Sequence, residues 1–257
     1  MKWHRALLAL ALAAALAGCG GGASTTIRSA TEPRSQLPAL PGEVLAVQRG
    51  KRTVLVDLKG HVLAHIDGWI PGTRLNQPQL YRGSQARTID RAARRLVPFV
   101  PDLPAARGGC TPVGTLGESQ LVECTSQGDP SLSIRRPDGT STPLVPPASR
   151  HGLWLGAFAS PDGKRLLLQW SAECETPFAL VAPAAGGRAG LVTGGKIRSG
   201  APESYALGWT HDGRALVELP QGACGGGTAP PGVYGFAADG SRRLIARGFP
   251  AAFFGGE

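Results

Sequence analysis

The chain has 257 residues, 42% of them hydrophobic, which is enough for one sizeable core or a single all-β domain. Its net charge of +9 favours anionic lipid headgroups or acidic glycans as binding surfaces. The same charge argues against self-association, so we expect a monomer.

The chain begins with the pattern of an export signal. Lys2 and Arg5 precede an apolar stretch, Ala6–Ala17, that is too short to span a bilayer. Leu16-Ala17-Gly18-Cys19 resembles the lipobox of bacterial lipoproteins, which are cut before the cysteine and carry lipid on it. The resemblance implies that residues 1–18 are removed and that Cys19 anchors an extracytoplasmic protein to the cell membrane, or to an outer membrane where one exists. An ordinary signal peptide with a coincidental cysteine is the alternative, and export in either form argues against nucleic acid as a partner.

Residues 19–42 are predicted to be a flexible tether. Gly, Ser and Thr dominate Gly20–Gln36, and two prolines stiffen the approach to the first apolar segment. The alternative is a loop packed on the domain, for which only Ile27 and Leu37 would serve as anchors.

Residues 43–257 contain a repeated hairpin pattern. Phe158–Trp170 and Gly208–Leu219 each place an Asp-Gly turn between two short strands, and Asp-Gly tolerates the positive φ angles of a tight hairpin. A second kind of hairpin is expected at Val54–Ile66, Ala86–Phe99, Ser131–Val145, Leu180–Val192 and Val233–Ala246. The Arg-rich run within Ala86–Phe99 is equally compatible with a short helix.

These second hairpins begin near residues 54, 86, 132, 178 and 233, so the later units lie 46, 46 and 55 residues apart, which is close to the repeat of four-stranded propeller blades. Ser160-Pro161-Asp162-Gly163-Lys164 resembles the WD40-like repeat of TolB-type periplasmic propellers, and Thr210-His211-Asp212-Gly213-Arg214 matches it in part. The resemblance implies an all-β, β-propeller-like fold of about five four-stranded blades, some of them degenerate. An incomplete propeller or a β-sandwich is the alternative, and a propeller specifies no activity.

Once Cys19 carries lipid, four cysteines remain, and an even number in an exported protein predicts two disulfides. Three pairings are possible, and the repeat favours Cys110 with Cys124 and Cys174 with Cys224. A metal site is the rival interpretation, but the sequence has no Cys-x-x-Cys or Cys-x-His pair, so no metal ligand is predicted.

If the four strands of a blade run outward from the axis, alternate connections lie on opposite faces. The Asp-Gly turns all fall on one face, here called the turn face, and the four cysteines fall on the other, the loop face. The loop face also carries the longest loops, including Pro220–Gly232, and long loops on a rigid scaffold often bind partners. The binding candidates on it are Glu123, Glu173, Glu175 and Gln221. The disulfides are equally explained as restraints on these loops.

Two patterns in the sequence resemble parts of catalytic or metal sites, and neither is complete. Gly190–Lys196 has the spacing of a phosphate loop, but Ile197 stands where Ser or Thr is required. His61 and His65 lie in an expected hairpin, about 13 Å apart, which is too far to share a metal. We therefore predict no catalytic residue and no cofactor.

Two further groups of residues have competing explanations. The densest basic run comprises Arg87, Arg91, Arg94 and Arg95. It either docks an anionic headgroup or polymer or is solvated surface charge. Three tryptophans are expected in the core: Trp154, Trp170 and Trp209. A sugar-stacking role would require at least one of them to be exposed.

The sequence thus predicts a lipid-anchored cell-envelope protein that acts as a non-catalytic binding or scaffolding module for a protein or glycan partner. The alternatives are a propeller-type hydrolase or lyase acting on an extracytoplasmic glycan or peptide, and an accessory subunit of an envelope complex. An enzyme predicts acidic or histidine residues converging at the axial opening, whereas a binding module predicts apolar and small groups there.

Overall fold

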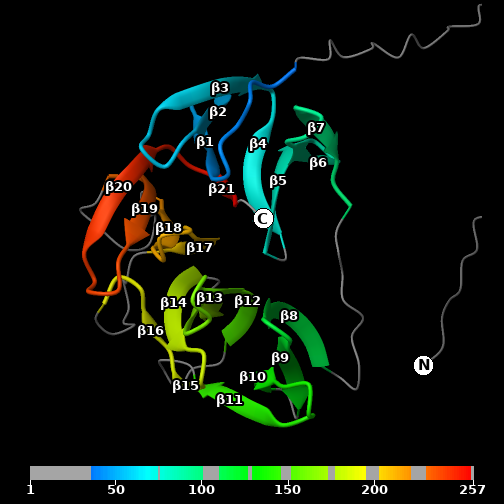
Figure 1. The fold of residues 1–257 in the computed structure, drawn as a ribbon, viewed down its shortest axis with the longest axis vertical. Helices are drawn as coiled ribbons and strands as arrows, with labels where there is room; N and C mark the ends of the chain where they lie inside the picture. The colour runs from blue at the N-terminus through cyan, green and yellow to red at the C-terminus, as the bar shows by residue number, and fades with distance from the viewer. Residues whose placement is uncertain are drawn as a thin grey trace, which may run out of the picture. The chain divides into compact units, whose positions relative to one another are not determined.

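Five antiparallel sheets follow one another along the chain in the computed structural model, each with four principal strands (Figure 1). The structure describes residues 36–74, 76–100, 110–126, 129–145, 152–172, 177–194, 203–220 and 230–255. No helix occurs in these ranges, and accordingly none of sufficient length and hydropathy to cross a membrane. The predicted propeller-like fold is confirmed, because a sandwich would have two sheets and not five successive ones.

The sheets are numbered here as blades 1 to 5, with strands given from the innermost outward. Blade 1 contains β21 (Ala251–Phe254), β1 (Val44–Arg49), β2 (Arg52–Val56) and β3 (Val62–Asp67). Blade 2 contains β4 (Ile70–Arg74), β5 (Gln77–Arg82), β6 (Gln85–Asp90) and β7 (Arg95–Pro98). Blade 3 contains β8 (Cys110–Leu116), β9 (Ser119–Ser126), β10 (Asp129–Arg135) and β11 (Ser141–Val145), with β15 (Gly187–Arg188) as a short parallel addition. Blade 4 contains β12 (Gly152–Ala159), β13 (Arg165–Ala172), β14 (Pro177–Pro183) and β16 (Gly190–Leu191). Blade 5 contains β17 (Tyr205–Trp209), β18 (Ala215–Leu219), β19 (Gly232–Phe236) and β20 (Arg242–Arg247).

All the predicted hairpins are present. The two hairpins with an internal Asp-Gly turn are β12–β13 and β17–β18, and the glycines of their turns, Gly163 and Gly213, have φ of 67° and 76°. The five second hairpins are β2–β3, β6–β7, β10–β11, β14–β16 and β19–β20. The Arg-rich run is therefore the turn of a hairpin, and the short helix considered for it does not form.

The two ends of the described chain close blade 1 together. β21 comes from the C-terminal end and pairs antiparallel with β1, with Val44 opposite Phe254 and Val47 opposite Ala251. All four residues of β21 are buried. The sequence predicted the outer hairpin of this blade, but not which segment forms its innermost strand.

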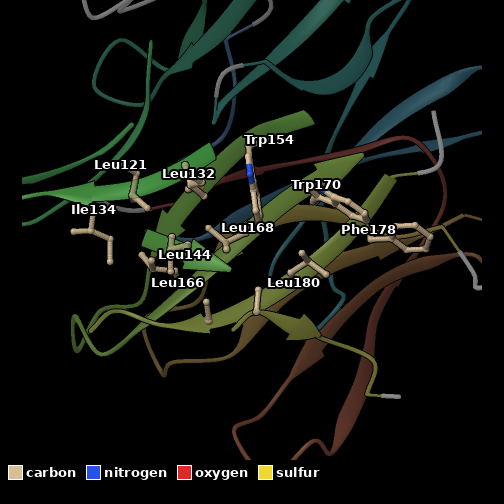
Figure 2. Close-up of a cluster of buried hydrophobic side chains, with 13 residues drawn as sticks. Leu121, Leu132, Ile134, Leu144, Trp154, Leu166, Leu168, Trp170, Phe178 and Leu180 are labelled. Carbon is tan, nitrogen blue, oxygen red and sulfur yellow. The ribbon is translucent and has the colours of Figure 1, made fainter. Parts of the chain in front are cut away.

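Shared apolar clusters fill four of the five spaces between neighbouring blades. Representative residues are Leu55 with Leu80 between blades 1 and 2, Leu132 with Leu166 between blades 3 and 4 (Figure 2), Leu167 with Trp209 between blades 4 and 5, and Leu216 with Val47 between blades 5 and 1. Within the part of the chain that the structure describes, no such cluster joins blades 2 and 3. We call this space the 2–3 seam.

The face of blade 3 that points away from blade 4 is mainly polar. In β10, Leu132 and Ile134 are buried in the cluster shared with blade 4. Successive side chains of a strand point to opposite faces, so Ser131, Ser133 and Arg135 point toward the seam, and these three are half-buried or exposed. Val122 of β9 is a buried apolar side chain on the same face. Blade 3 thus has one apolar face and one mainly polar face.

Candidate ligand-binding cleft

A cleft of about 1160 Å³ lies at the propeller axis and continues into the 2–3 seam. The innermost strands of blades 4, 5 and 1 contribute Ala157, Trp209 and Phe253 to its lining. Further lining residues come from the second or third strand of the seam blades, Gln120 of β9 on one wall and Thr88 of β6 on the other. The cleft therefore extends from the axis into the space between blades 2 and 3.

Most of the cleft lining is apolar or small, and its two ionisable side chains among the described residues are Asp90 and Arg91. Asp90 accepts a hydrogen bond from the backbone N–H of Ala93 at 2.8 Å. The terminal nitrogens of Arg91 donate to the carbonyl oxygens of Pro41 and Phe254 at 2.5 and 2.6 Å. Burial lowers the pKa of the Arg91 guanidinium. Oδ1 of Asp90 and the terminal nitrogens of Arg91 thus bind the protein's own backbone.

Asn76, which follows β4, reaches across the cleft. Its Oδ1 accepts the N–H of Ala157 at 3.0 Å, and its Nδ2 donates to the carbonyl oxygens of Ala157, at 3.0 Å, and of Val113. Its φ of 63° lies in the left-handed region that asparagine tolerates better than most residues. Gly156 leaves room for this side chain, because a Cβ there would lie 2.0 Å from Oδ1. A single side chain therefore connects blades 2, 3 and 4.

A polar side chain on the second strand of three blades binds the innermost strand of the next blade. In each case a side-chain oxygen accepts a backbone N–H. The pairs are Glu123 with Trp154 at 3.2 Å, Gln169 with Ala206 at 2.6 Å and Glu218 with Ala251 at 3.2 Å. Gln79 of β5 occupies the comparable place in blade 2, is 1% exposed, and has no hydrogen-bond partner for its Nε2. Among the described residues, no such contact is recorded between Gln79 and the innermost strand of blade 3.

Two of these acceptors are carboxyl groups, of which Glu123 is half-buried and Glu218 is buried. Burial raises the pKa of Glu123, and the N–H of Trp154 opposes the shift. Burial raises the pKa of Glu218 to about 8, again opposed by one backbone hydrogen bond, from Ala251. Oε1 of Glu218 has no hydrogen-bond partner. Gln169 makes the equivalent contact without a titratable group.

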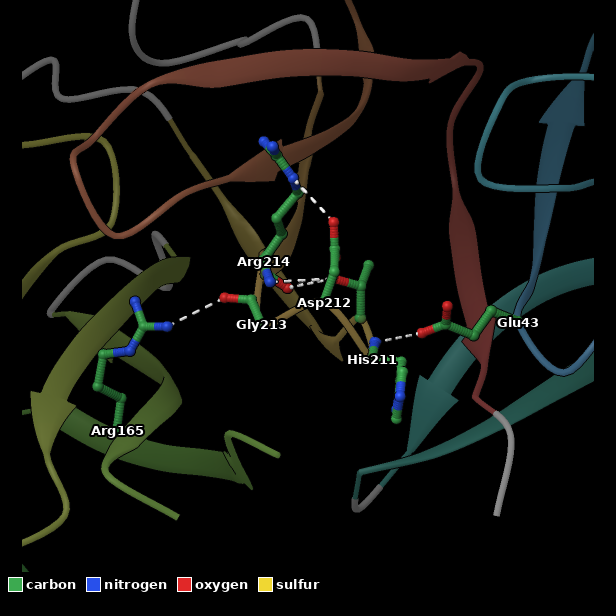
Figure 3. Close-up of polar contacts among 7 residues, drawn as sticks. Glu43, Arg165, His211, Asp212, Gly213 and Arg214 are labelled. Carbon is green, nitrogen blue, oxygen red and sulfur yellow. Dashed lines mark hydrogen bonds and ion pairs between the residues drawn. The ribbon is translucent and has the colours of Figure 1, made fainter. Parts of the chain in front are cut away.

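The turn face is held together by contacts between the Asp-Gly turns and their neighbours. Arg165 Nη2 donates to the carbonyl oxygen of Gly213 at 3.0 Å, joining blade 4 to blade 5 (Figure 3). The backbone N–H of His211 donates to Glu43, which lies just before β1 (Figure 3). The lining residues Gly42 and Pro161 place one mouth of the cleft at this face.

The predicted binding residues lie elsewhere. Glu123 is on the blade 4 side of β9, half-buried against Trp154, and is not a lining residue of the cleft. Glu173, Glu175 and Gln221 lie outside the described residues, so their binding role stays a prediction. A binding surface was predicted on the loop face, whereas the cleft reaches the turn face.

One predicted disulfide is confirmed. Cys110 and Cys124 are directly opposite each other on β8 and β9 and are bonded. Cys174 and Cys224, like the proposed lipid attachment site Cys19, fall outside the described residues, so their pairing remains a prediction.

The basic run is largely occupied in intramolecular contacts. Arg87 lies over the ring of Trp69, with Cζ 5.2 Å from the ring centroid. Arg94 Nε donates to the carbonyl oxygen of Leu37 at 2.8 Å, and the N–H of Leu37 donates back to Arg94 at 2.7 Å. Leu37 is buried against blades 1 and 2, so contacts of the folded domain extend into the segment predicted to be a tether.

The tryptophans occupy the core as expected. Trp154, Trp170 and Trp209 are 4%, 1% and 8% exposed. None of the three is exposed as the sugar-stacking alternative required, although Trp209 contributes to the lining of the cleft.

Comparison with known proteins assigns the chain to no family. No protein-family model matches the sequence, and no curated protein is significantly similar to it. Among solved structures, the chain is similar to the crystal structure of TolB from Acinetobacter baumannii, with a TM-score of 0.35 and 12% sequence identity. The match covers 80% of this chain and 55% of the TolB chain, so this chain spans little more than half the length of that protein.

Proposed function

We propose that this protein is a non-catalytic binding or scaffolding module of the bacterial cell envelope, anchored through lipid on Cys19, and that the cleft holds its ligand. The observation that carries the proposal is the lining of the cleft. It is mainly apolar and small, and Asp90 and Arg91 are its two ionisable side chains among the described residues. Oδ1 of Asp90 accepts one backbone hydrogen bond, and Arg91 donates to backbone carbonyl oxygens. Acid–base catalysis draws on acids and bases that converge on the substrate, and the described lining holds no histidine and no second carboxyl group.

The anchor and the tether fit this role. Between Cys19 and Leu37, the first buried residue of the described chain, an extended chain spans at most about 60 Å. The domain therefore has room to meet a partner away from the membrane surface while remaining attached to it.

The anchor is tested by expressing the full chain and Cys19→Ala in a bacterium and measuring the mass of the N-terminal peptide from each cell fraction. We expect an acylated Cys19 in the membrane fraction for the native sequence and no acylation for the variant. Equal membrane recovery of an unacylated native protein would refute the anchor.

The binding site is tested by thermal unfolding of the full-length protein in detergent, with and without envelope-derived glycans and peptides. Thr115 lines the cleft and Ser141, on the outer strand β11, does not. A ligand bound in the cleft raises the Tm of the native protein and of the matched control Ser141→Trp, but not that of Thr115→Trp. An equal rise in all three would move the site elsewhere, and recovery of cleaved ligand would favour the enzyme alternative.

A further inference from the structure

We infer that the folded domain makes a contact of its own with the membrane, in which a basic patch on the loop face lies against an anionic lipid surface. The loop-face patch consists of five exposed cationic side chains from blades 1, 2 and 5: Arg49, Lys51, Arg52, Arg82 and Arg247. The inference goes beyond ligand binding in the cleft, and it rests on the proposed anchor only for keeping the domain near the membrane.

Four of the five cations surround the turn between β1 and β2. Arg49 and Arg52 are directly opposite each other on these strands, and Lys51 lies in the turn that joins them. Arg49 Nε donates to the carbonyl oxygen of Arg247, at the end of β20, at 3.1 Å. The patch therefore continues from blade 1 to blade 5.

On its other side the patch continues to blade 2. Arg52 is opposite Asp67 on β3, with 3.2 Å between Nε and Oδ1. Both side chains are largely exposed, at 68% and 74%, so water weakens this ion pair. A Cβ on the next residue, Gly68, would lie 3.8 Å from Cδ of Arg82, whose guanidinium lies over the ring of Trp69. Asp67 is thus one acidic group among five cations.

The patch lies at the opposite end of the strands from the turn face. β1 begins at Val44, next to Glu43 of the turn face, and reaches Arg49 about 20 Å away, the length of six extended residues. On the turn face, acids and bases alternate within single turns. Examples are Asp138 with Arg136, Asp162 with Lys164 and Asp212 with Arg214. A surface of one predominant sign, such as the patch, attracts anions more strongly than such a mixed surface.

Two exposed apolar side chains lie beside the cations. Phe249 is 45% exposed, and its N–H donates to the carbonyl oxygen of Gln48, the neighbour of Arg49, at 3.1 Å. Ile70 is 50% exposed and follows Trp69, whose carbonyl oxygen accepts the hydroxyl of Thr53, the neighbour of Arg52. Basic side chains next to aromatic and aliphatic ones suit the interface of an anionic bilayer. The patch contributes no residue to the lining of the cleft, so it is not part of that site.

Two further acidic groups lie behind Phe249. Its ring centroid is 6.2 Å from that of Tyr205, whose pKa is raised by burial, Glu203 and Glu218. Burial raises the pKa of Glu218 to about 8, so this carboxyl group is mostly neutral at pH 7. Subtracting Asp67 and the half-buried Glu203 leaves the five-cation patch with a charge of +3.

The anchor and the patch can meet the same membrane. The N–H of Leu37 donates to Arg94 in the β6–β7 turn, so the tether joins the domain at the turn face. The span of at most about 60 Å between Cys19 and Leu37 exceeds the strand length of about 20 Å, so the chain can pass to the loop-face side. With the patch on the lipid, the turn-face mouth of the cleft points away from the membrane.

The test uses full-length acylated protein added from detergent to preformed vesicles of phosphatidylcholine, or of an equal mixture of phosphatidylcholine and phosphatidylglycerol. Flotation measures vesicle binding. The rate of reaction with a membrane-impermeant maleimide is measured for Ser84→Cys, two residues from Arg82, and for the matched control Ser141→Cys at the turn-face end of β11. The signal of the native protein is subtracted from both.

We expect the anionic vesicles to slow labelling of Ser84→Cys more than about tenfold relative to neutral vesicles, and to leave Ser141→Cys unchanged. Raising NaCl from about 0.05 to 0.5 M should restore the rate, because salt screens charges at the surface. Arg49→Gln, Arg52→Gln and Arg247→Gln together should also restore it. The matched triple variant Arg136→Gln, Lys164→Gln and Arg243→Gln should not.

The remaining outcomes separate the patch from the anchor. Flotation with both vesicle types but equal labelling of Ser84→Cys on both would overturn the inference and leave the anchor standing. Flotation with anionic vesicles alone, with Ser84→Cys protected, would support the patch and count against the anchor, whereas flotation with neither would count against both. Protection of Ser84→Cys by soluble dextran sulfate but not by anionic lipid would assign the patch to an acidic polymer and overturn the inference.

Discussion

The carboxamide of Asn76 accepts the backbone N–H of Ala157 and donates to the carbonyl oxygen of the same residue, on a strand two blades further along the chain. Because the same amide also binds Val113, this residue fixes the separation of blades 2, 3 and 4 at the cleft. Substitution of Asn76 therefore tests whether this side chain maintains the separation of the three blades at the cleft.

We predict that Asn76→Ala lowers the free energy of unfolding by about 1–3 kcal/mol, because it leaves backbone groups of Ala157 and Val113 without partners. Gly156→Ala should also be destabilising, since its Cβ would collide with Oδ1 of Asn76. The cost of Gly156→Ala should shrink in the Asn76→Ala background. Urea denaturation of both single variants and the double variant measures this coupling, and strictly additive changes would show that the two residues do not interact.

Glu218 should make stability depend on pH. Its pKa is about 8 in the folded protein and 4.5 is its ordinary value, so between these pH values the folded state holds a proton that the unfolded state has lost. The stabilisation is complete below about pH 4.5 and is lost as pH rises through about 8, with a slope of at most about 1.4 kcal/mol per pH unit.

Glu218→Gln keeps the hydrogen bond to Ala251 and removes the titration. We predict a flatter stability profile and a variant more stable than the native protein at pH 9, measured by urea denaturation across pH 4–9. Glu118→Gln, at an exposed turn, is the control and should reproduce the native profile. Parallel profiles for native protein and Glu218→Gln would exclude a buried proton at this site.

The disulfide between Cys110 and Cys124 closes a loop with a sequence separation of 14. Replacing both cysteines by serine should lower the free energy of unfolding by about 3 kcal/mol, the loop-closure value for this length. Equilibrium unfolding under non-reducing conditions gives the loss, and peptide masses before and after reduction report the partner of Cys174. A bond from Cys174 to any cysteine other than Cys224 would contradict the predicted pairing.

Arg91 joins blade 2 to both ends of the folded chain through the carbonyl oxygens of Pro41, Phe254 and Gly255. Arg91→Ala should cost about 1–3 kcal/mol and speed amide exchange in β21, because hydrogen bonds from a charged group are lost. Arg91→Lys should recover only part of the lost stability, since a lysine ammonium lacks the planar, forked arrangement of donors in a guanidinium. Arg95→Ala, at an exposed position of the same hairpin, is the control. Unchanged exchange in β21 for Arg91→Ala would contradict the assigned contact.

Local sequence features predicted much of the fold because hairpin formation is local. Asp162-Gly163 and Asp212-Gly213 encode tight turns whatever lies around them, and both turns carry the same hydrogen bonds, with Ser160 or Thr210 bonded to the aspartate. The disulfide between Cys110 and Cys124 was predicted from the repeat of these hairpins, and the two cysteines lie opposite each other on β8 and β9.

The cleft and the closure of blade 1 escaped prediction because they depend on distant segments. Pairing of β1 with β21 joins opposite ends of the domain, and an unfilled seam is a property of two sheets and not of one strand. A signal was nevertheless present. The second strand of blades 2 to 5 carries a buried or half-buried Gln or Glu near its middle, at Gln79, Glu123, Gln169 and Glu218. Reading this recurrence would have identified Glu123 as an inter-blade contact.

The pairing of β21 with β1 also constrains how the protein is made. The innermost strand of blade 1, β21, follows the strands of all the other blades in the sequence, so blade 1 stays incomplete until those blades have been made. Until then one edge of β1 lacks its partner and can pair with another chain. Nascent molecules are thus prone to aggregate before β21 is made, and truncation before Ala251 would leave every copy in that state.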